Sequence, residues 1–583
     1  MKIEFLIRNG TVVDGTGAPA YRADVRIRDG KIAEIGQNLQ QQKGERLFDA
    51  HGCFVTPGTI ENHNHWDGAM WWSPMMEPLA SYGVTTSVNG NCGFSMAPLS
   101  AEHDIRPEII DIFNYFEDVP MAPMNSAVTW DWRTWSEYKA SVQRNVRTQV
   151  NISSFCGHIP LRLATMGLEA WDRAATPDEV ARMCVLLDDA LAAGALGMSS
   201  NLLDYDRHER PLPSYKADDA EWKALIAVLG RYPGVTLQLP IDNFMRKTAG
   251  ASAQRIADLV KEVAPALRVQ LAGFRPALDF QSPWVPEQEE LNEKFKAEGL
   301  DIWAGYHHVG PTLHVNFAQS LLFAQQGNYV WQEIVNETDF DKKMAMLADP
   351  EWRARARDSW DNQHSHTMLN DPSVLLLRES QTGAGPIGIS LSQYMHQMGL
   401  NHPSDAMAEW ALVNGPESNV QMPEWPNNQE LLMKLYREPN TIGNLSDAGA
   451  HTTLFCGAGD NVLLLTEWVR DKKMLTIEEA IHVLSGKAAK HFGFEDRGTI
   501  EVGKRADIMV FDLEEIARRP EAKVWDVPDG LGGRTYRYTR QAAPMRLTLC
   551  NGIATFDNGE ITGNFPGEFI GPQASEPFAM AAE

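Results

Sequence analysis

Residues 176–200 read TPDEVARMCVLLDDALAAGALGMSS, which places a helix signal directly before a strand signal. Thr176 and Glu179 have the spacing of a capping box, and a proline between them occupies the first helical position. Apolar residues then recur at helical spacing until Gly194, a residue type that often ends helices. Residues 195–200 form a short, mostly apolar run, as expected of a buried strand. This stretch therefore predicts one helix followed by one strand.

The same unit occurs twice more, with helices predicted near 219–229 and 253–263 and strands near 235–239 and 267–271. Repeated units of this kind predict a parallel sheet, which is either closed into a barrel or open and doubly wound. The open form is disfavoured because no Gly-x-Gly-x-x-Gly turn opens a unit near the start of the chain. We therefore predict an α/β fold based on a (β/α)8 TIM barrel.

Both chain ends lack this alternation and carry short apolar runs separated by turn dipeptides such as Asn9-Gly10 and Asn551-Gly552. We predict that the two ends together form a small β-sandwich domain. Two stretches of the middle, 101–145 and 275–440, are too long to be simple connections, and we predict that they are elaborated loops over one face of the barrel. The expected domains are the N-terminal part of the sandwich at 1–58, the barrel at 59–495 with a large insertion at about 275–440, the C-terminal part of the sandwich at 496–570, and a flexible tail at 571–583.

The composition excludes several classes of partner. The 583-residue chain has a formal net charge of −25, which disfavours nucleic acids and anionic membranes because both need clustered Lys and Arg. The sequence lacks a signal-peptide pattern, and no apolar run approaches the roughly 18 residues that cross a bilayer. Six cysteines lie far apart without CxxC pairs, which favours a reducing cytoplasm. We expect a small-molecule substrate, and a homo-oligomer stays an open alternative.

Three short segments carry side chains suited to metal binding or acid–base chemistry. His63 and His65 follow the run VTPGTIE, and in an extended segment both imidazoles face one ion; a pair of solvated loop histidines is the alternative. Cys92 ends a β-branched strand, as a thiolate ligand or as a small buried apolar residue. Asp447 lies at the end of a late strand, where a ligand, a general base and a helix cap are all plausible.

These residues lie in motifs that resemble the N-acyl-D-amino-acid deacylase (D-aminoacylase) branch of the amidohydrolase superfamily. The resemblance covers roughly residues 5–100, 150–275 and 440–565. Its most specific motif is GNCG, because few branches of the superfamily place a cysteine on the second strand. The matching motifs are VxPGxIxxHxH at 55–65, GVTT at 83–86, GNCG at 90–93, GHxxLR at 157–162, SDAGAH at 446–451 and GTIxxGKxADIxVFD at 498–512.

The resemblance implies a metal-dependent hydrolase that cleaves an amide C–N bond of a small N-acylated amine or amino acid by a metal-activated water. It implies that the metal, Zn²⁺, is bound by His63, His65, Cys92 and Asp447. Asp447 would also be the general base, since a carboxylate beside a zinc-activated water can take its proton. His158 would stabilise the oxyanion, with packing beneath the metal as the alternative.

Two further residues are expected near the substrate. Arg275 follows the sixth strand, where the family carries a Lys that binds the substrate carboxylate; an Arg can hold a carboxylate through two hydrogen bonds, and a surface ion pair is the alternative. Asp67 is expected to bind substrate or to orient a ligand histidine, unless it is only a turn residue.

The sequence departs from the family at the ends of the fifth and sixth strands. The family places a histidine at each end, whereas Leu239 and Gly273 stand there in this chain. The second metal subsite has therefore lost two of its three ligands, so we predict a single zinc ion. Replacement ligands from the insertion are the alternative, and the candidates are the histidine pairs at 307–308 and at 364 and 366.

Two other functions stay open on the sequence alone. The same site could hydrolyse a cyclic amide or imide, or an ester or lactone. The other possibility is a scaffold protein of the same fold that catalyses no reaction, and the missing histidines favour it. The joint presence of His63, His65, Cys92 and Asp447 argues against the scaffold.

Overall fold

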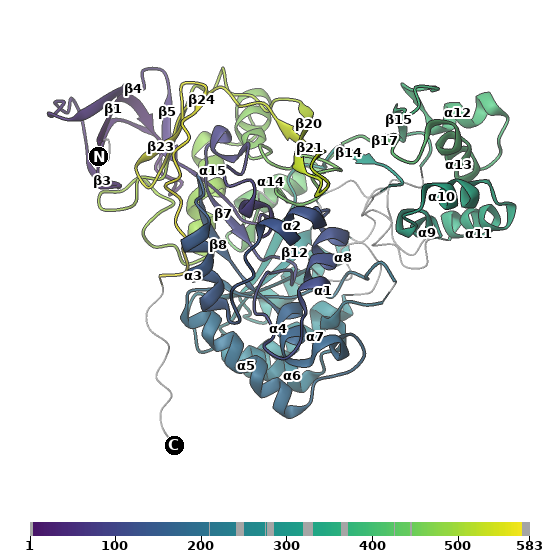
Figure 1. The fold of residues 1–583 in the computed structure, drawn as a ribbon. Coiled ribbons are helices and arrows are strands. Elements are labelled where there is room, and N and C mark those ends of the chain that lie inside the picture. Colours follow the sequence, from purple (N-terminus) through teal and green to yellow (C-terminus); the bar gives the residue numbers. More distant parts are fainter. Residues whose placement is uncertain are drawn as a thin grey trace.

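A computed structural model of the chain describes residues 4–208, 210–240, 250–274, 276, 285–318, 330–362, 371–424, 426–443 and 446–573. Three regions are distinct in Figure 1. A sheet from the two chain ends lies at the upper left, parallel strands with their helices occupy the centre, and a lobe of helices and short strands lies at the right.

The central strands run parallel in one continuous order. They form two hydrogen-bonded sheets, β6-β7-β8 and β9-β10-β11-β12-β13-β18, in which every pairing is parallel. Only Phe155 separates β8 from β9, and its amide donates to the Asn89 carbonyl at 3.1 Å, so the two sheets adjoin. The strands are β6 (Thr59–Glu61), β7 (Val84–Asn89), β8 (Asn151–Ser154), β9 (Cys156–Gly157), β10 (Gly197–Ser199), β11 (Thr236–Pro240), β12 (Arg268–Phe274), β13 (Ile302–Tyr306) and β18 (Thr441–Ile442).

The segment after β6 lies beside the segment after β18, the last of the parallel strands. The His65 amide donates to the Ala448 carbonyl at 2.9 Å, and the Asp447 amide donates to the His63 carbonyl at 3.1 Å. Asn64 and Ala448 also form a parallel bridge. These contacts bring residues nearly 400 positions apart in the chain to one place.

The helices begin and end where the sequence signals lie. Helix α5 (Pro177–Ala192) starts at the capping box of Thr176 and Glu179, as predicted, and helix α6 (Asp219–Leu229) has its predicted bounds. Each of these two helices buries an apolar face, as amphipathic helices that cover a sheet do. The remaining helices around these strands are α4 (His158–Met166), α7 (Ala251–Val263), α8 (Val285–Ala297), α14 (Gln429–Arg437), α15 (Ile477–Ile481) and α16 (Lys487–His491).

Strands from both ends of the chain form one sheet of nine strands, while its packing as a sandwich stays a prediction. The order is β24-β23-β22-β19-β5-β1-β2-β3, and β4 pairs with β1. Strand β5 joins the two ends because it pairs with β1 on one side and with β19 on the other. The strands are β1 (Glu4–Val12), β2 (Tyr21–Arg28), β3 (Lys31–Gly36), β4 (Glu45–Asp49), β5 (Phe54–Pro57), β19 (Ile508–Phe511), β22 (Met545–Cys550), β23 (Ile553–Asp557) and β24 (Glu560–Ile561).

Part of the range predicted as an insertion, about 275–440, belongs to the parallel strands. Helix α8 and strand β13 lie inside that range, yet β13 pairs with β12 and β18 and so belongs to the parallel strands. Strand β13 has five residues, too few to show a clear periodicity in the sequence. The separate lobe at the right of Figure 1 contains α9 (Trp331–Asn336), α10 (Phe340–Ala348), α11 (Pro350–Asp361), α12 (Leu391–Met398), α13 (Pro403–Asn414), β15 (Leu376–Glu379), β16 (Ile389–Ser390) and β17 (Asn419–Met422), and β14 (Leu313–Val315) pairs with β17.

The other long stretch, 101–145, contains three helices rather than a loop. A separate hairpin follows β19. The helices are α1 (Arg106–Phe116), α2 (Met121–Ala127) and α3 (Trp135–Asn145), and the hairpin strands are β20 (Glu521–Pro528) and β21 (Arg534–Arg540).

All six cysteines are free thiols. Among the described residues, no helix is both long and apolar enough to span a bilayer. The cytoplasmic location and the oligomeric state stay predictions, and most of the predicted tail at 571–583 lies outside the described residues.

Candidate metal centre

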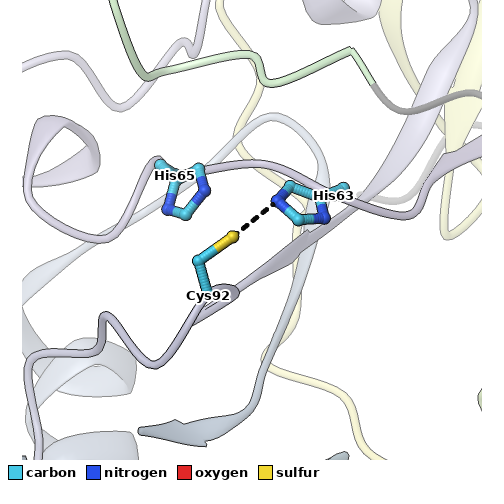
Figure 2. A group of neighbouring side chains, drawn as sticks. All are labelled: His63, His65 and Cys92. Carbon is cyan, nitrogen blue, oxygen red and sulfur yellow. Dashed lines mark hydrogen bonds between the residues drawn. The ribbon is translucent and has the colours of Figure 1, made fainter. Parts of the chain in front are cut away.

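His63 and His65 lie in the extended segment after β6. Alternation along this segment turns the residue between them, Asn64, to the opposite side. There its side-chain oxygen accepts hydrogen bonds from the Ser446 hydroxyl at 2.9 Å and the Ala448 amide at 3.1 Å. The two imidazoles, both buried, are thereby held together with ring centroids 5.3 Å apart (Figure 2).

Cys92 reaches the same place from the loop after β7. Its φ is 55°, a left-handed conformation that few non-glycine residues adopt, and it lies between Gly90 and Gly93, which also have positive φ. The Cys92 amide donates to the side-chain oxygen of Gln238 at 3.0 Å. The thiol sulfur then lies 3.2 Å from His63 Nε2, and Figure 2 shows it directed toward the two imidazoles.

Asp447 completes the predicted set of four residues. Its Oδ1 lies 3.6 Å from His63 Nε2 and 3.4 Å from His65 Nε2. Asp447 also has a left-handed backbone, with φ of 56°. Among the described residues, the ligand-type atoms of His63, His65 and Cys92 lie within 4.8 Å of one another. The structure therefore brings together the four residues that the sequence singled out.

These donor groups fit a zinc ion. Two imidazoles, a thiolate and a carboxylate make up a donor set typical of tetrahedral zinc. Asp447 Oδ1 is buried without a hydrogen-bond partner, and burial lowers the pKa of His65 to about 3, so this ring is neutral and able to coordinate. Burial raises the pKa of the Cys92 thiol, and the carboxylates of Glu117, Asp447 and Asp204 raise it further. A bound cation would reverse that effect, because coordination deprotonates a thiol.

The four residues open onto a cavity of about 80 Å³. Glu117, Asp204, His307 and His451 line this cavity too, along with aromatic side chains. The sequence reasoning missed Glu117, Asp204 and His451 as site residues. The motif SDAGAH contains His451 and held a usable signal, whereas Glu117 and Asp204 lie in stretches without a recognisable pattern. His307 is one of the insertion histidines considered as a replacement ligand.

The structure places His158 and Asp67 away from the lining of this cavity. His158 is fully buried, with Nδ1 2.9 Å from the Ser200 hydroxyl and Nε2 2.8 Å from a Glu221 carboxylate oxygen. Asp67 accepts a hydrogen bond from the Gly90 amide at 3.2 Å, so it supports the loop that carries Cys92. Neither residue is among those that line the cavity, and the oxyanion role of His158 and the substrate-binding role of Asp67 stay predictions.

The ends of β11 and β12 supply no ligand at the two positions where the family has histidines. Leu239 is fully buried in the apolar core. Gly273 lines the cavity but has no side chain. Arg275, His364 and His366 lie outside the described residues.

The model of the amidohydrolase family matches residues 46–553, which is most of the chain. The chain belongs to the amidohydrolase family. This match includes every residue of the candidate metal centre and the cavity around it. The predicted class of enzyme, a metal-dependent hydrolase of non-peptide C–N bonds, is therefore confirmed at the level of the family.

Similar proteins include two deacylases of Alcaligenes xylosoxydans xylosoxydans. The D-aminoacylase is 34% identical over 577 residues, covering 98% of this chain and 98% of the relative. The N-acyl-D-aspartate deacylase is 25% identical over 587 residues, covering 100% of this chain and 97% of the relative.

A solved structure has the same fold. The N-acyl-D-glutamate deacylase of Bordetella bronchiseptica, complexed with zinc and a phosphonate mimic of the tetrahedral intermediate, superposes with a TM-score of 0.63 at 21% identity. The match covers 98% of this chain and 100% of that one. These comparisons confirm the resemblance to the D-aminoacylase branch.

Proposed function

We propose that this amidohydrolase removes the acyl group from a small N-acylated amine or amino acid, as N-acyl-D-amino-acid deacylases do. The observation that carries the proposal is the convergence of His63, His65, Cys92 and Asp447 on one cavity. The D-aminoacylase and the N-acyl-D-aspartate deacylase among its relatives support this substrate class.

The proposal includes the architecture that forms the site. The parallel strands form a closed (β/α)8 barrel, because strands this far apart in sequence converge on one point only when the sheet closes. The contacts between the segments after β6 and β18 support closure. The ligands follow the carboxyl ends of their strands, where barrel enzymes have their active sites. The β-sandwich at 1–58 and 496–570 would pack beside the barrel.

We infer a single Zn²⁺ ion, held by His63, His65, Cys92 and Asp447. The empty ligand positions at Leu239 and Gly273 support one ion rather than two. When bound, such an ion lowers the pKa of a water molecule and polarises a carbonyl group.

Asp447 would move the proton during hydrolysis. It takes a proton from the attacking water and passes it to the leaving nitrogen as the C–N bond breaks, which yields a carboxylic acid and an amine. Its Oδ1 faces the two ligand imidazoles, and its Oδ2 lies 3.6 Å from His451 Nε2. We assign no proton transfer to His158, since both of its ring nitrogens have partners in the protein interior.

A substrate panel tests this function. The zinc-loaded protein is incubated with N-acetyl-D- and N-acetyl-L-amino acids, a cyclic imide and a lactone, and released amine or acid is measured. We expect amine release from an N-acetyl-amino acid, its loss after chelation and its return with added zinc. Turnover of only the imide or the lactone would replace the proposal by the alternative hydrolase. Absence of both turnover and stoichiometric metal would favour the scaffold.

A further inference from the structure

Glu117 contacts the candidate metal centre although it belongs to none of the strands that carry the ligands. It directly follows α1, in a stretch that the sequence suggests is only an elaborate connection. Glu117 is only 3% exposed, and it lines the cavity. A buried carboxylate at this position requires a partner or a role, because an isolated buried charge is costly.

Two backbone contacts fix Glu117 against the segment that follows Asp447. The His451 amide donates to the Glu117 carbonyl at 2.6 Å. Two residues further on, the Thr453 amide donates to a carboxylate oxygen of Asp118, the residue after Glu117, at 2.9 Å. The end of α1 therefore lies against residues 451–453, and the backbone contact with His451 sets the position of Glu117.

The Glu117 carboxylate lies between two imidazoles. One oxygen is 3.6 Å from His65 Nδ1 and the other is 3.5 Å from His451 Nε2. The opposite ring nitrogen of His65, Nε2, lies 3.4 Å from Asp447 Oδ1 on the metal side. The Glu117 contact to His65 is slightly longer than a hydrogen bond, and among the described residues His65 Nδ1 has no hydrogen-bond partner. Glu117 is therefore the carboxylate placed to accept the N–H of His65, a contact that fixes the tautomer and ring orientation of a metal-binding histidine.

His451 links the same carboxylate to Asp447. Its Nε2 is 3.5 Å from a Glu117 oxygen and 3.6 Å from Asp447 Oδ2. Cys92, Asp118, Asp447 and His451 all have φ between 52° and 56°, so left-handed non-glycine residues gather around this centre. Such conformations persist only where the surrounding structure enforces them, and they are concentrated at functional sites.

We propose that Glu117 and His451 are positioning residues of the metal centre: Glu117 orients His65 for coordination, and His451 holds the second oxygen of Asp447. This inference rests on the proposed function, since it assigns the residues that hold the ligand and the base in place. Neither residue carries out a bond-making step. The side chains of His65, Glu117, His451 and Asp447 follow one another in that order, at 3.6, 3.5 and 3.6 Å.

The test compares Glu117→Ala and Glu117→Gln with Asp118→Asn, each loaded with zinc and titrated with a competing chelator. Glu117→Ala is expected to bind zinc about 10–100-fold more weakly, the range for loss of a carboxylate behind a ligand histidine. Glu117→Gln should lie between Glu117→Ala and the wild type, because an amide has one acceptor oxygen for two imidazoles. Asp118→Asn changes the neighbouring carboxyl group but keeps an oxygen that can accept from the Thr453 amide, so it should keep wild-type affinity.

His451→Ala tests the other half of the pair. It should lower kcat at an unchanged KM and leave zinc affinity within a few-fold of the wild type, because His451 lies against Asp447 Oδ2, whereas Oδ1 faces the two ligand imidazoles. The absorption spectrum of the Co²⁺-substituted protein should change in Glu117→Ala and stay unchanged in Asp118→Asn.

Wild-type zinc affinity in Glu117→Ala, or an equal loss in Asp118→Asn, would overturn the inference. Failure of the proposed function looks different, since the wild-type protein itself would then bind no zinc or release no amine. A wild type that binds zinc and hydrolyses its substrate, together with indifferent Glu117 and His451 variants, would refute only the positioning role.

Discussion

The two sides of the candidate site differ in what their strands deliver. The segments after β6, β7 and β18 supply two imidazoles, a thiol and a carboxylate, all within a few ångströms of one another. The ends of β11 and β12 supply Leu239, which packs in the core, and Gly273, which has no side chain. One side of this site thus offers side chains that can bind a cation, and the other side offers no ligand at positions 239 and 273.

The ligand-bearing side is held by hydrogen bonds from Asn64, Asp67 and Gln238 to its backbone. Gln238 belongs to β11 and lies directly before Leu239, so β11 still positions the loop that carries Cys92 although its end offers no ligand. The contrast can be tested on either side.

The largest effect is expected from Asp447→Asn, on the ligand-bearing side. The amide keeps the size of the side chain but cannot accept the proton, so kcat/KM should fall by about 10²–10⁴-fold, the usual contribution of a general base. Steady-state kinetics with the best substrate of the panel measures this. Asp526→Asn, an exposed change on the β20–β21 hairpin, is the control and should keep full activity. Equal activity in the two variants would remove Asp447 from the mechanism.

A smaller effect is expected when one ligand is removed. Cys92→Ala should weaken zinc binding by more than about 100-fold, beyond the range for residues that only support a ligand. Cys156→Ala is the matched control, because Cys156 is equally a free cysteine but is fully buried in β9. That variant should lose about 1 kcal/mol of unfolding free energy and keep its zinc. Metal analysis and thermal unfolding of both variants separate binding from stability, and zinc retention in Cys92→Ala would contradict the ligand assignment.

The smallest effect is expected on the side without ligands. Gly273 has φ of 93°, so Gly273→Ala should cost about 1–2 kcal/mol of stability through backbone strain alone. The number of zinc ions per chain should not change, since the backbone and not a side chain occupies this place. Chemical denaturation with parallel metal analysis checks both points. A change in zinc stoichiometry would mean that this side takes part in binding after all.

Local signals in the sequence predicted much of the fold. The capping box at Thr176 placed α5, and the turn dipeptides at the chain ends indicated short strands there, which the structure joins in one sheet. Strand β13 was missed because its five residues carry little periodicity. Its recognition depends on pairing with β12 and β18, which no local pattern reveals.

The candidate site was predictable only where motifs carry its residues. His63, His65, Cys92 and Asp447 follow strands in recognisable motifs, whereas Glu117 follows a helix and meets them only through tertiary packing. His158 lies in a matching motif too, yet its ring is held by Ser200 and Glu221 in the interior. A motif therefore identifies a kind of segment but not the direction of each side chain in it.

The central claim is that one zinc ion is bound by His63, His65, Cys92 and Asp447. Anomalous diffraction at the zinc edge, from crystals grown with zinc, tests it most directly. The account predicts a single peak within coordination distance of those four side chains and no peak beside Leu239 or Gly273. A second peak on that opposite side, or none among the four side chains, would contradict it.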